Sequence, residues 1–314
     1  MRIFQLIISI FVLLSLSNCN SPSVPSKKVK NIAIASDFLN PSDTIFFKDF
    51  SKKEKVKITI LSMSTDSIVN HYEVFGYNSK FDLVLMKSVY SLDILSKNQI
   101  LQPIIDSNNI NDKGLVSPKN DWIALGLDPY VVTGLKEQRG FQYNELTFGD
   151  KWKNELTESD FALFQSSVMF QFGRKNIKKS LGWLQKIDNQ TLTIEDTTTV
   201  VPYQLTKLSL IKRNDKTFVY PSQSQKFGAF YDAIGVGIVR HSSKYTVASK
   251  FIDFHQKLAH NQNLCNNFHV LPLQNPKNLS VYTYQNNYPF LFRCSPRKAV
   301  TNFRDLHKVR HRIE

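Results

Sequence analysis

Segments with the patterns of strands and of helices alternate along this chain, and this alternation constrains the possible fold more than any other feature of the sequence. Residues 31–35, 56–61 and 82–86 are short runs of aliphatic and β-branched residues, which are typical of strands. Residues 41–53 and 66–75 lie between these runs and carry apolar side chains at helical spacing. Alternation of this kind predicts an α/β fold, in which helices cover a sheet.

The same alternation continues in the later part of the chain. Residues 122–125, 130–133 and 234–239 read as further strands, and Ser88 is expected to cap a helix that follows residue 86. An amphipathic helix is expected after residue 239. The apolar face of that helix is expected to carry Val247, Phe251, Phe254 and Leu258.

The beginning of the chain has the pattern of a bacterial export signal. Arg2 supplies a positive charge, residues 3–14 form an almost unbroken apolar run, and Leu-Ser-Asn-Cys at 16–19 ends it. This run is too short for a spanning helix, which needs about 20 apolar residues. Because its ending resembles a lipobox, we predict that residues 1–18 are a signal peptide and that Cys19 carries a lipid with acyl chains such as palmitate. Ordinary cleavage beside a free cysteine is the alternative.

The stretch 19–28 is polar and contains two prolines, so we expect a linker between the lipid and the folded body. No later segment is long and apolar enough to cross a bilayer. The sequence therefore predicts a location in the periplasm or cell envelope, with the lipid on Cys19 as the membrane anchor.

The mature chain is basic and contains few cysteines. The full sequence has a formal charge of +14, of which only Arg2 leaves with the predicted signal peptide, and the charge is spread along the chain. A basic surface attracts anionic lipids, nucleic acid or anionic ligands. Predicted export argues against nucleic acid as a partner. Cys265 and Cys294 could form a disulfide in an oxidising compartment, and two buried free thiols are the alternative. Residues 29–314 suffice for one large domain or two smaller ones.

Several short blocks of sequence resemble, in the same order, motifs of one known protein family. The block 78–85 reads Asn-Ser-Lys-Phe-Asp-Leu-Val-Leu, and the block 234–241 reads Ile-Gly-Val-Gly-Ile-Val-Arg-His. The remaining blocks are residues 56–61, 95–103, 121–125 and 148–153. Together they resemble the periplasmic solute-binding proteins of ABC importers, and in particular the ferric-ion-binding group.

This resemblance implies a two-lobed α/β clamp whose lobes are joined by two crossover hinge strands and close on a ligand. Residues 29–120 and 232–280 would form lobe 1, and residues 121–231 and 281–314 would form lobe 2. The resemblance also implies a monomer without catalytic activity or resident cofactor, which works with the permease and ATPase subunits of an importer.

The ferric site that the resemblance implies is incomplete in this sequence. Ferric sites use phenolate and carboxylate oxygens together with a bound anion. Where the family has two adjacent tyrosines, this chain has Tyr203 followed by Gln204, which leaves Tyr203 as the expected metal ligand. The family's carboxylate position holds Lys87, and the first strand ends at Asp37. Lys87 would suit an anionic ligand or an iron chelate better than a bare cation.

Three more residues complete the predicted site. Ser166 and Ser167 match the family's anion-binding helix start, where N–H groups and hydroxyls hold an anion, and an ordinary helix cap is the alternative. Tyr130 either reaches the cleft or packs in the core. The ligand-binding residues expected from the resemblance are Asp37, Lys87, Tyr130, Ser166, Ser167 and Tyr203.

The resemblance predicts a substrate-binding lipoprotein of an ABC importer for ferric iron or an iron chelate. A receptor for another small anion is an alternative. A surface lipoprotein that keeps the clamp fold but serves in interaction or assembly is another. The sequence contains no G-x-S-x-G, P-loop or H-E-x-x-H motif that would support an enzyme.

Overall fold

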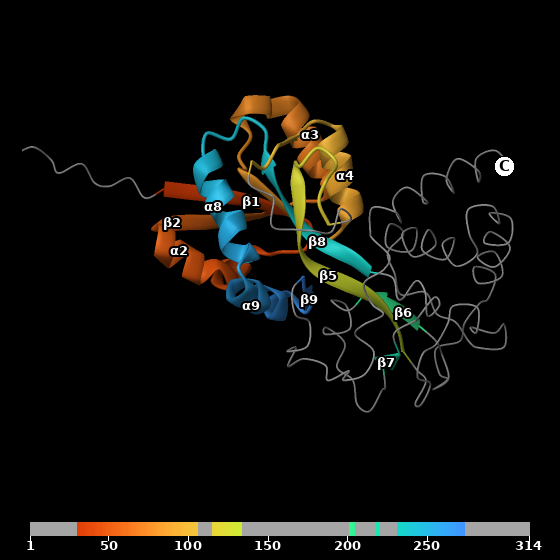
Figure 1. Ribbon diagram of the computed structural model, residues 1–314. Helices are drawn as coiled ribbons and strands as arrows, with labels where there is room; N and C mark the ends of the chain where they lie inside the picture. Colours follow the sequence, from red (N-terminus) through yellow and green to blue (C-terminus); the bar gives the residue numbers. More distant parts are fainter. Residues whose placement is uncertain (1–29, 106–114, 134–200, 205–217, 220–230, 274–314) are drawn as a thin grey trace, which may run out of the picture.

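The computed structural model of the protein describes residues 30–105, 115–133, 201–204, 218–219 and 231–273. For residues 129–133, 201–204, 218–219 and 231 it describes the backbone. The described strands form a mixed sheet in the order β2-β1-β3-β8-β5-β6, while β4 pairs with β8, and β7 and β9 pair with β5 (Figure 1). The α/β fold predicted from the sequence is confirmed.

The first strands form the parallel part of the sheet. β1 (Lys30–Ser36) lies between β2 (Val56–Ser62) and β3 (Leu83–Met86) and is parallel to both. The predicted strands at 31–35, 56–61 and 82–86 are therefore confirmed. The helices that follow these strands are η1 (Pro41–Phe47), α2 (Lys48–Glu54), α3 (Thr65–Phe75), η2 (Gly76–Asn78) and α4 (Val89–Lys97).

The helix predicted over residues 41–53 is only partly correct, because it begins as the 3-10 helix η1 and becomes α-helical at Lys48. Pro41 suits the first turn, where its missing N–H would have no helical partner. Asp43 Oδ2 accepts a hydrogen bond from Asn40 N at 2.8 Å and so closes this end. At the other end Lys55 adopts a left-handed conformation with φ 54° and stops α2.

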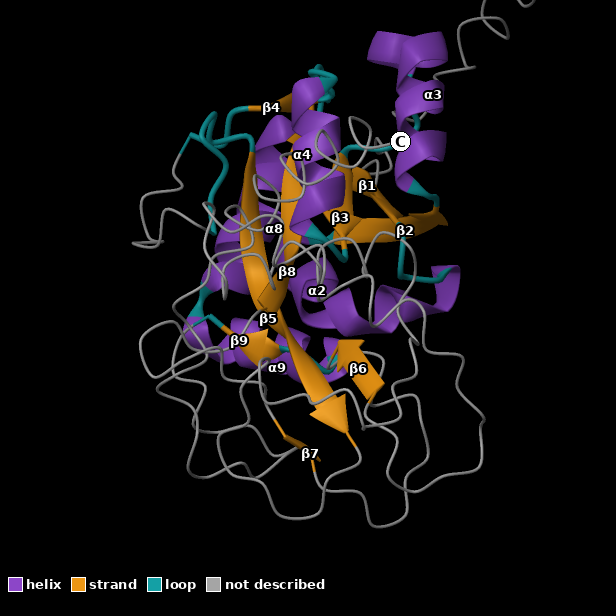
Figure 2. Cartoon of the chain, turned by 90° about the vertical axis from the view of Figure 1, so that its right-hand side faces the viewer, coloured by secondary structure: helices purple, strands orange, loops and turns teal. Residues whose placement is uncertain are grey.

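Antiparallel strands occupy the centre of the sheet. β8 (Tyr231–Val239) lies between β3 and β5 (Trp122–Thr133) and is antiparallel to both. β4 (Leu101–Gln102) pairs with β8, and β9 (Leu271–Pro272) pairs with β5. β5 then continues beyond β8 to pair with β6 (Val201–Gln204) and β7 (Phe218–Val219), as Figure 2 shows.

β5 corrects the prediction of two separate strands at 122–125 and 130–133. Asp128-Pro129 lies between these segments and is a turn signal in the sequence. In the structure the pairing with β8 continues through this dipeptide, with Pro129 opposite Tyr231, so the backbone stays extended. A shift of register between Ala124 and Gly126 marks a bulge earlier in the strand.

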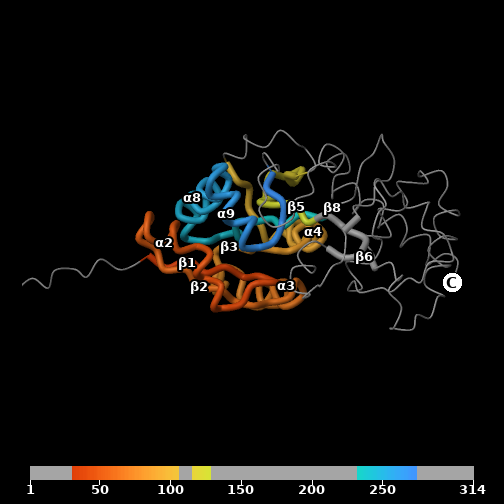
Figure 3. Tube along the Cα trace, turned by 90° about the horizontal axis from the view of Figure 1, so that it is seen from below, coloured from red at the N-terminus to blue at the C-terminus, as the bar shows by residue number. Residues whose placement is uncertain are grey.

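Helices cover both faces of the sheet (Figure 3). One face carries η1, α2, α8 (Tyr245–Gln256) and α9 (Leu258–Phe268), and the other carries α3 and α4. The packing against α4 is close, because a Cβ on Gly235 of β8 would lie 2.5 Å from Leu92 Cδ1. No helix of the described residues has the length and apolar character needed to cross a bilayer.

The amphipathic helix predicted after residue 239 is present but ends earlier than expected. Lys257 is extended, with φ −65° and ψ 133°, so it separates α8 from α9. Leu258 therefore begins a new helix and is 42% exposed, whereas Phe251 and Phe254 are buried. The prediction that Leu258 continues the apolar face was wrong, because the chain turns between the two helices.

Aromatic rings fill the layer between α8 and the helices that follow β1. The ring of Phe251 lies 5.3 Å from that of Phe47 and 5.2 Å from that of Phe50. The imidazole of His255 lies among these rings and is 4.5 Å from Phe251 and 5.1 Å from Phe254. Its two ring nitrogens have no hydrogen-bond partner among the described residues, and burial lowers the pKa of His255 to about 3, with a smaller contribution from His260.

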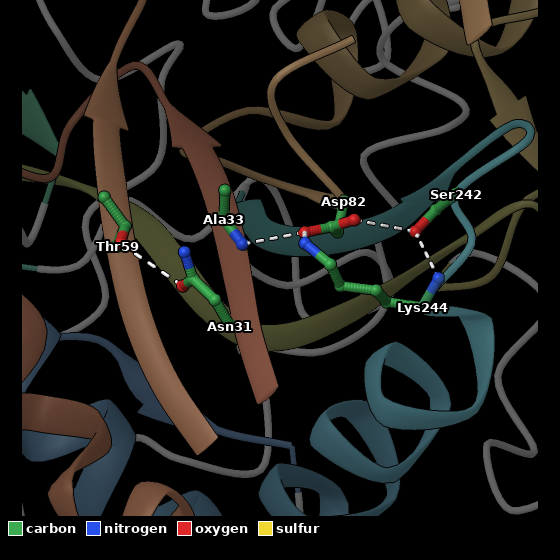
Figure 4. A network of polar contacts seen from close by, with 6 residues as sticks. All are labelled: Asn31, Ala33, Thr59, Asp82, Ser242 and Lys244. Carbon is green, nitrogen blue, oxygen red and sulfur yellow. Dashed lines mark hydrogen bonds and ion pairs between the residues drawn. The ribbon is translucent and has the colours of Figure 1, made fainter. Parts of the chain in front are cut away.

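Asp82 connects three parts of this domain at the beginning of β3 (Figure 4). Its Oδ2 accepts a hydrogen bond from Ala33 N of β1 at 2.9 Å and an ion pair from Lys244 Nζ at 3.0 Å. Its Oδ1 accepts from Ser242 Oγ at 2.9 Å. The side chain of Asp82 is almost completely buried, so these partners replace the water that a carboxylate would otherwise bind.

Candidate ligand-binding site

Two of the predicted ligand-binding residues lie on neighbouring loops at the carboxyl ends of parallel strands. Asp37 follows β1, Lys87 follows β3, and these strands are paired. Asp37 Oδ1 accepts a hydrogen bond from the backbone N–H of Lys87 at 2.9 Å. Asp37 is exposed and Lys87 is half-buried. Ligands of open α/β sheets bind outside the carboxyl ends of strands, so this pair occupies a suitable place for a ligand.

The loop that carries Asp37 is shaped by the last residue of β1. Ser36 is fully buried, and its Oγ accepts hydrogen bonds from Phe38 N at 3.4 Å and Leu39 N at 3.3 Å. Its carbonyl oxygen accepts from Met63 N at 2.8 Å. These bonds turn the chain directly after the strand, which leaves Asp37 at the edge of the sheet.

The loop that carries Lys87 leads straight into α4. Ser88 Oγ accepts a hydrogen bond from Tyr90 N at 3.1 Å, which confirms the predicted cap. Asp232 of β8 supplies a second acceptor, because its Oδ1 lies 3.0 Å from Val89 N and 2.7 Å from Ala233 N. A carboxylate at the amino end of a helix is favoured by the helix dipole. Asp232 therefore connects the central strand β8 to the loop of Lys87.

Asp232 was not predicted as a site residue, although the sequence contains one signal for it. An acidic residue directly precedes the apolar run 233–239, and such a residue must find partners when the strand is buried. Asp232 is 2% exposed and lies opposite Asp128 in the pairing of β5 with β8. Asp128 is fully buried. The two long strands thus place two carboxylates side by side, near the point where β5 leaves β8.

The two predicted tyrosines lie on neighbouring strands. Tyr130 on β5 pairs with Gln204 on β6, and Val131 pairs with Tyr203. The two tyrosines are therefore one register position apart in a pair of adjacent strands. This pairing begins where the pairing of β5 with β8 ends at Pro129.

The remaining predicted residues lie outside the described part of the chain. These are Cys19, Ser166, Ser167 and Cys294. Cys265 is 1% exposed, and its Sγ donates hydrogen bonds to Leu125 O at 3.5 Å and to Asn261 Oδ1 at 3.8 Å. Burial raises the pKa of the Cys265 thiol. The disulfide with Cys294 stays a prediction.

The described loops offer a carboxylate and an ammonium group at one edge of the sheet. The described residues contain no group of three or more His, Cys, Asp or Glu side chains arranged to hold a metal ion. A bare ferric ion would need more anionic oxygen ligands than Asp37 supplies, whereas Lys87 could pair with the negative charge of an anionic ligand. This part of the site therefore favours a ligand that brings its own anionic oxygens.

Comparisons with known proteins find similarity in structure. The sequence matches no protein-family model and no curated protein. Solved structures match over most of the chain. A ferric binding protein from Campylobacter jejuni is 14% identical with a TM-score of 0.71, and the match covers 90% of this chain and 99% of that one.

Two further matches differ in the ligands that they contain. A Trichodesmium protein (IdiA, FutA) in complex with iron and citrate ligands is 16% identical with a TM-score of 0.67, covering 90% of this chain and 99% of that chain. The periplasmic binding protein AfuA from Actinobacillus pleuropneumoniae, with exogenous fructose-6-phosphate bound, is 13% identical with a TM-score of 0.61, covering 89% and 97%. The chain thus shares the two-lobed α/β fold of these proteins, as the sequence resemblance predicted.

Proposed function

We propose that this protein is the solute-binding subunit of an ABC importer and that its ligand is a chelate of ferric iron. The observation that carries the importer role is the match of fold over about nine-tenths of the chain to ferric-binding proteins from several bacteria. The protein would bind and release its ligand and would carry out no catalysis. Its expected partners are the permease and ATPase subunits.

A chelate is favoured over a bare ion by the contact between Asp37 and Lys87. The backbone N–H of Lys87 is bonded to Asp37 Oδ1, so the loop of Lys87 lies beside the loop that carries this carboxylate. An iron–citrate ligand presents free carboxylates that an ammonium group can bind. Tyr203 would supply the phenolate oxygen to the metal, with Tyr130, Ser166 and Ser167 contributing further contacts to the ligand.

A second candidate ligand is a small phosphorylated or carboxylated anion without iron. Lys87 stands where the resemblance expects a carboxylate, and one protein of similar fold binds fructose-6-phosphate. The visible absorbance of the ligand-loaded protein separates the two candidates, because only an iron ligand would be coordinated by a phenolate.

A panel of ligands tests the proposal through thermal stability. Ferric citrate at 100 times its Kd should stabilise the full mature chain by about 2.7 kcal/mol. Lys87→Glu should weaken binding at least tenfold, because it replaces an attraction to the anionic ligand with a repulsion. Lys52→Glu is the matched control, since Lys52 is exposed on α2 at the opposite ends of the strands.

Several outcomes of this panel would contradict the proposal. If ferric citrate, ferric iron, phosphate and fructose-6-phosphate all leave the melting temperature unchanged, the importer role is wrong and an interaction or assembly role gains support. If Lys87→Glu binds ferric citrate as well as Lys52→Glu does, Lys87 is not a ligand contact.

Tyr203 gives the proposal a spectroscopic test. Direct coordination of ferric iron by a phenolate produces absorbance in the visible range, so the chain loaded with ferric citrate should be coloured. Tyr203→Phe should remove or strongly reduce this band, because phenylalanine has no oxygen to coordinate iron. A band of unchanged intensity in Tyr203→Phe would assign the coordination to another residue.

The division of the chain into lobes is part of the same proposal. Lobe 1 would consist of residues 29–120 and 232–280, and lobe 2 of residues 121–231 and 281–314. β5 pairs with β8 up to Pro129 and with β6 from Tyr130 onward. This change of partner strand supports a hinge formed by β5 and β8. Signal cleavage after residue 18 and a lipid on Cys19 would hold the protein at the membrane near its permease.

A further inference from the structure

Exposed apolar side chains gather at one corner of the domain, between the end of α3 and the beginning of β3. Val74 is 74% exposed, Phe75 46% and Tyr77 76%. Large apolar residues with this exposure are few in the described chain, where the others are Ile45, Ile105 and Leu258. Single exposed apolar residues are normal, but several within four positions indicate a contact surface.

Ring contacts hold this group in place. The imidazole of His71 lies 4.5 Å from the ring of Phe75 and 5.3 Å from that of the buried Phe81. The ring of Tyr77 lies 3.9 Å from that of His241, which belongs to the turn between β8 and α8. The surface is thus built from two separate parts of the chain and is fixed to the core.

Basic residues surround the apolar group. Lys80 is exposed, and its N–H is 3.5 Å from His71 Nε2. Arg240 precedes His241 and is half-buried. The nearby carboxylate of Asp82 is paired with Lys244, and Glu73 is the exposed acid on the same turn of α3. The local balance of charge is therefore positive and complements an anionic partner.

The predicted linker enters the domain at the amino end of β1, on the same side of the sheet as the beginning of β3. Lys30 is exposed and begins β1, three residues before Ala33, whose N–H is bonded to Asp82. Three residues of a strand span about 10 Å. The segment 19–29 that joins Lys30 to Cys19 spans at most about 40 Å when fully extended. A lipid on Cys19 would therefore hold Lys30 within about 40 Å of the membrane.

We propose that Val74, Phe75 and Tyr77, together with Lys30, Lys80 and Arg240, form a docking surface for anionic phospholipid headgroups. This inference rests on the proposed lipid anchor for its tether. Aromatic side chains are favoured at the boundary between headgroups and acyl chains, and each basic residue near an anionic bilayer increases binding by about fivefold. Because the anchor supplies a high local concentration, a surface with low affinity for the bilayer suffices to orient the protein.

Vesicle binding of the mature chain from residue 19 tests this surface apart from the anchor, with Cys19→Ser to prevent lipidation. We expect binding to vesicles of phosphatidylcholine with 30% phosphatidylglycerol at low salt and at least tenfold weaker binding to pure phosphatidylcholine. The pair Phe75→Ser and Tyr77→Ser should reduce binding about tenfold. Lys30→Glu with Lys80→Glu should reduce it by at least about 25-fold, because two basic residues are lost and two acidic ones are added. The matched control is Ile45→Ser with Ile105→Ser, which removes exposed apolar residues elsewhere and should leave binding unchanged.

Circular dichroism and melting temperature establish that each variant is folded before it is compared. Equal binding to neutral and anionic vesicles, or equal binding of wild type and the Phe75/Tyr77 variant, would overturn the proposal. Loss of binding in the Ile45/Ile105 control would overturn it as well, because the effect would then be general. The lipid anchor on Cys19 is tested separately by the mass of the protein purified from membranes. The docking surface and the anchor can therefore fail independently of each other.

Discussion

Lowering the pH from 7 to 4 is expected to cost the folded protein about 3 kcal/mol through His255 alone. This side chain is 3% exposed and is surrounded by the rings of Phe47, Phe50, Phe251 and Phe254. A charged imidazole in this place would lose its hydration without gaining a partner among the described residues. One nearby charged group adds to the penalty, His260 on α9.

The direction of this effect follows from the pKa in the two states. Burial lowers the pKa of His255 in the folded protein to about 3, whereas the unfolded chain has the ordinary value of 6.5. Below pH 6.5 the unfolded state binds a proton that the folded state does not bind, so stability falls as the pH falls. The loss continues down to about pH 3, and the full contribution is present above pH 6.5.

His255→Leu should remove this dependence, because leucine has a similar volume and no proton to bind. Denaturant unfolding of the variant and of wild type at pH 7, 5.5 and 4 would give the free energy of unfolding at each pH. A difference between the two pH dependences can be assigned to His255, since both chains share all other titrating groups. His260→Gln is the matched control and should keep the steep loss. An identical pH dependence in His255→Leu and wild type would show that His255 does not control acid stability.

Asp82→Ala is expected to destabilise the fold by about 3 kcal/mol, which corresponds to a fall in melting temperature of roughly 5–10 °C. The substitution removes the acceptor of Ala33 N, Ser242 Oγ and Lys244 Nζ (Figure 4). The N–H of Ala33 is buried in β1, so water cannot replace its lost partner. Asp82→Asn keeps an acceptor oxygen and should lose about half as much.

A surface ion pair provides the control for Asp82. Glu54 and Lys250 form a pair at 3.0 Å, but both side chains are partly exposed to solvent. Glu54→Ala should therefore change stability by less than about 1 kcal/mol. If thermal unfolding gives the same small change for Asp82→Ala, the network at the beginning of β3 contributes no more than an exposed pair.

The sequence predicts the presence of the strands in this fold well and the boundaries of helices and strands poorly. The runs at 31–35 and 82–86 are largely apolar because both faces of the sheet are covered there, whereas along 56–61 buried residues alternate with exposed or half-buried ones. Both patterns are local in the sequence and do not depend on which strands pair. The continuity of β5 through Asp128-Pro129 depends on its partner strand β8, which is distant in sequence. The turn at Lys257 likewise depends on how α9 packs against β5, so local spacing suggested one long helix.

Part of the site follows from sequence because it lies at the ends of predictable strands. Asp37 and Lys87 each follow a parallel strand, and their contact agrees with that placement. Asp232 was missed because its role depends on a hydrogen bond to Val89, which lies 143 residues earlier in the chain. The roles of Tyr130 and Tyr203 in ligand binding stay predictions.

The position of β8 also determines when this domain can complete its fold. β8 separates β3 from β5 in the sheet, although it follows both in the chain, and Leu83 pairs with Ile238 across more than 150 residues. Residues 30–133 cannot complete the sheet before residue 239 has been synthesised, and such distant pairing slows folding. If the chain is exported, as its first residues predict, this delay would keep it unfolded during transport and let its sheet close on the far side of the membrane.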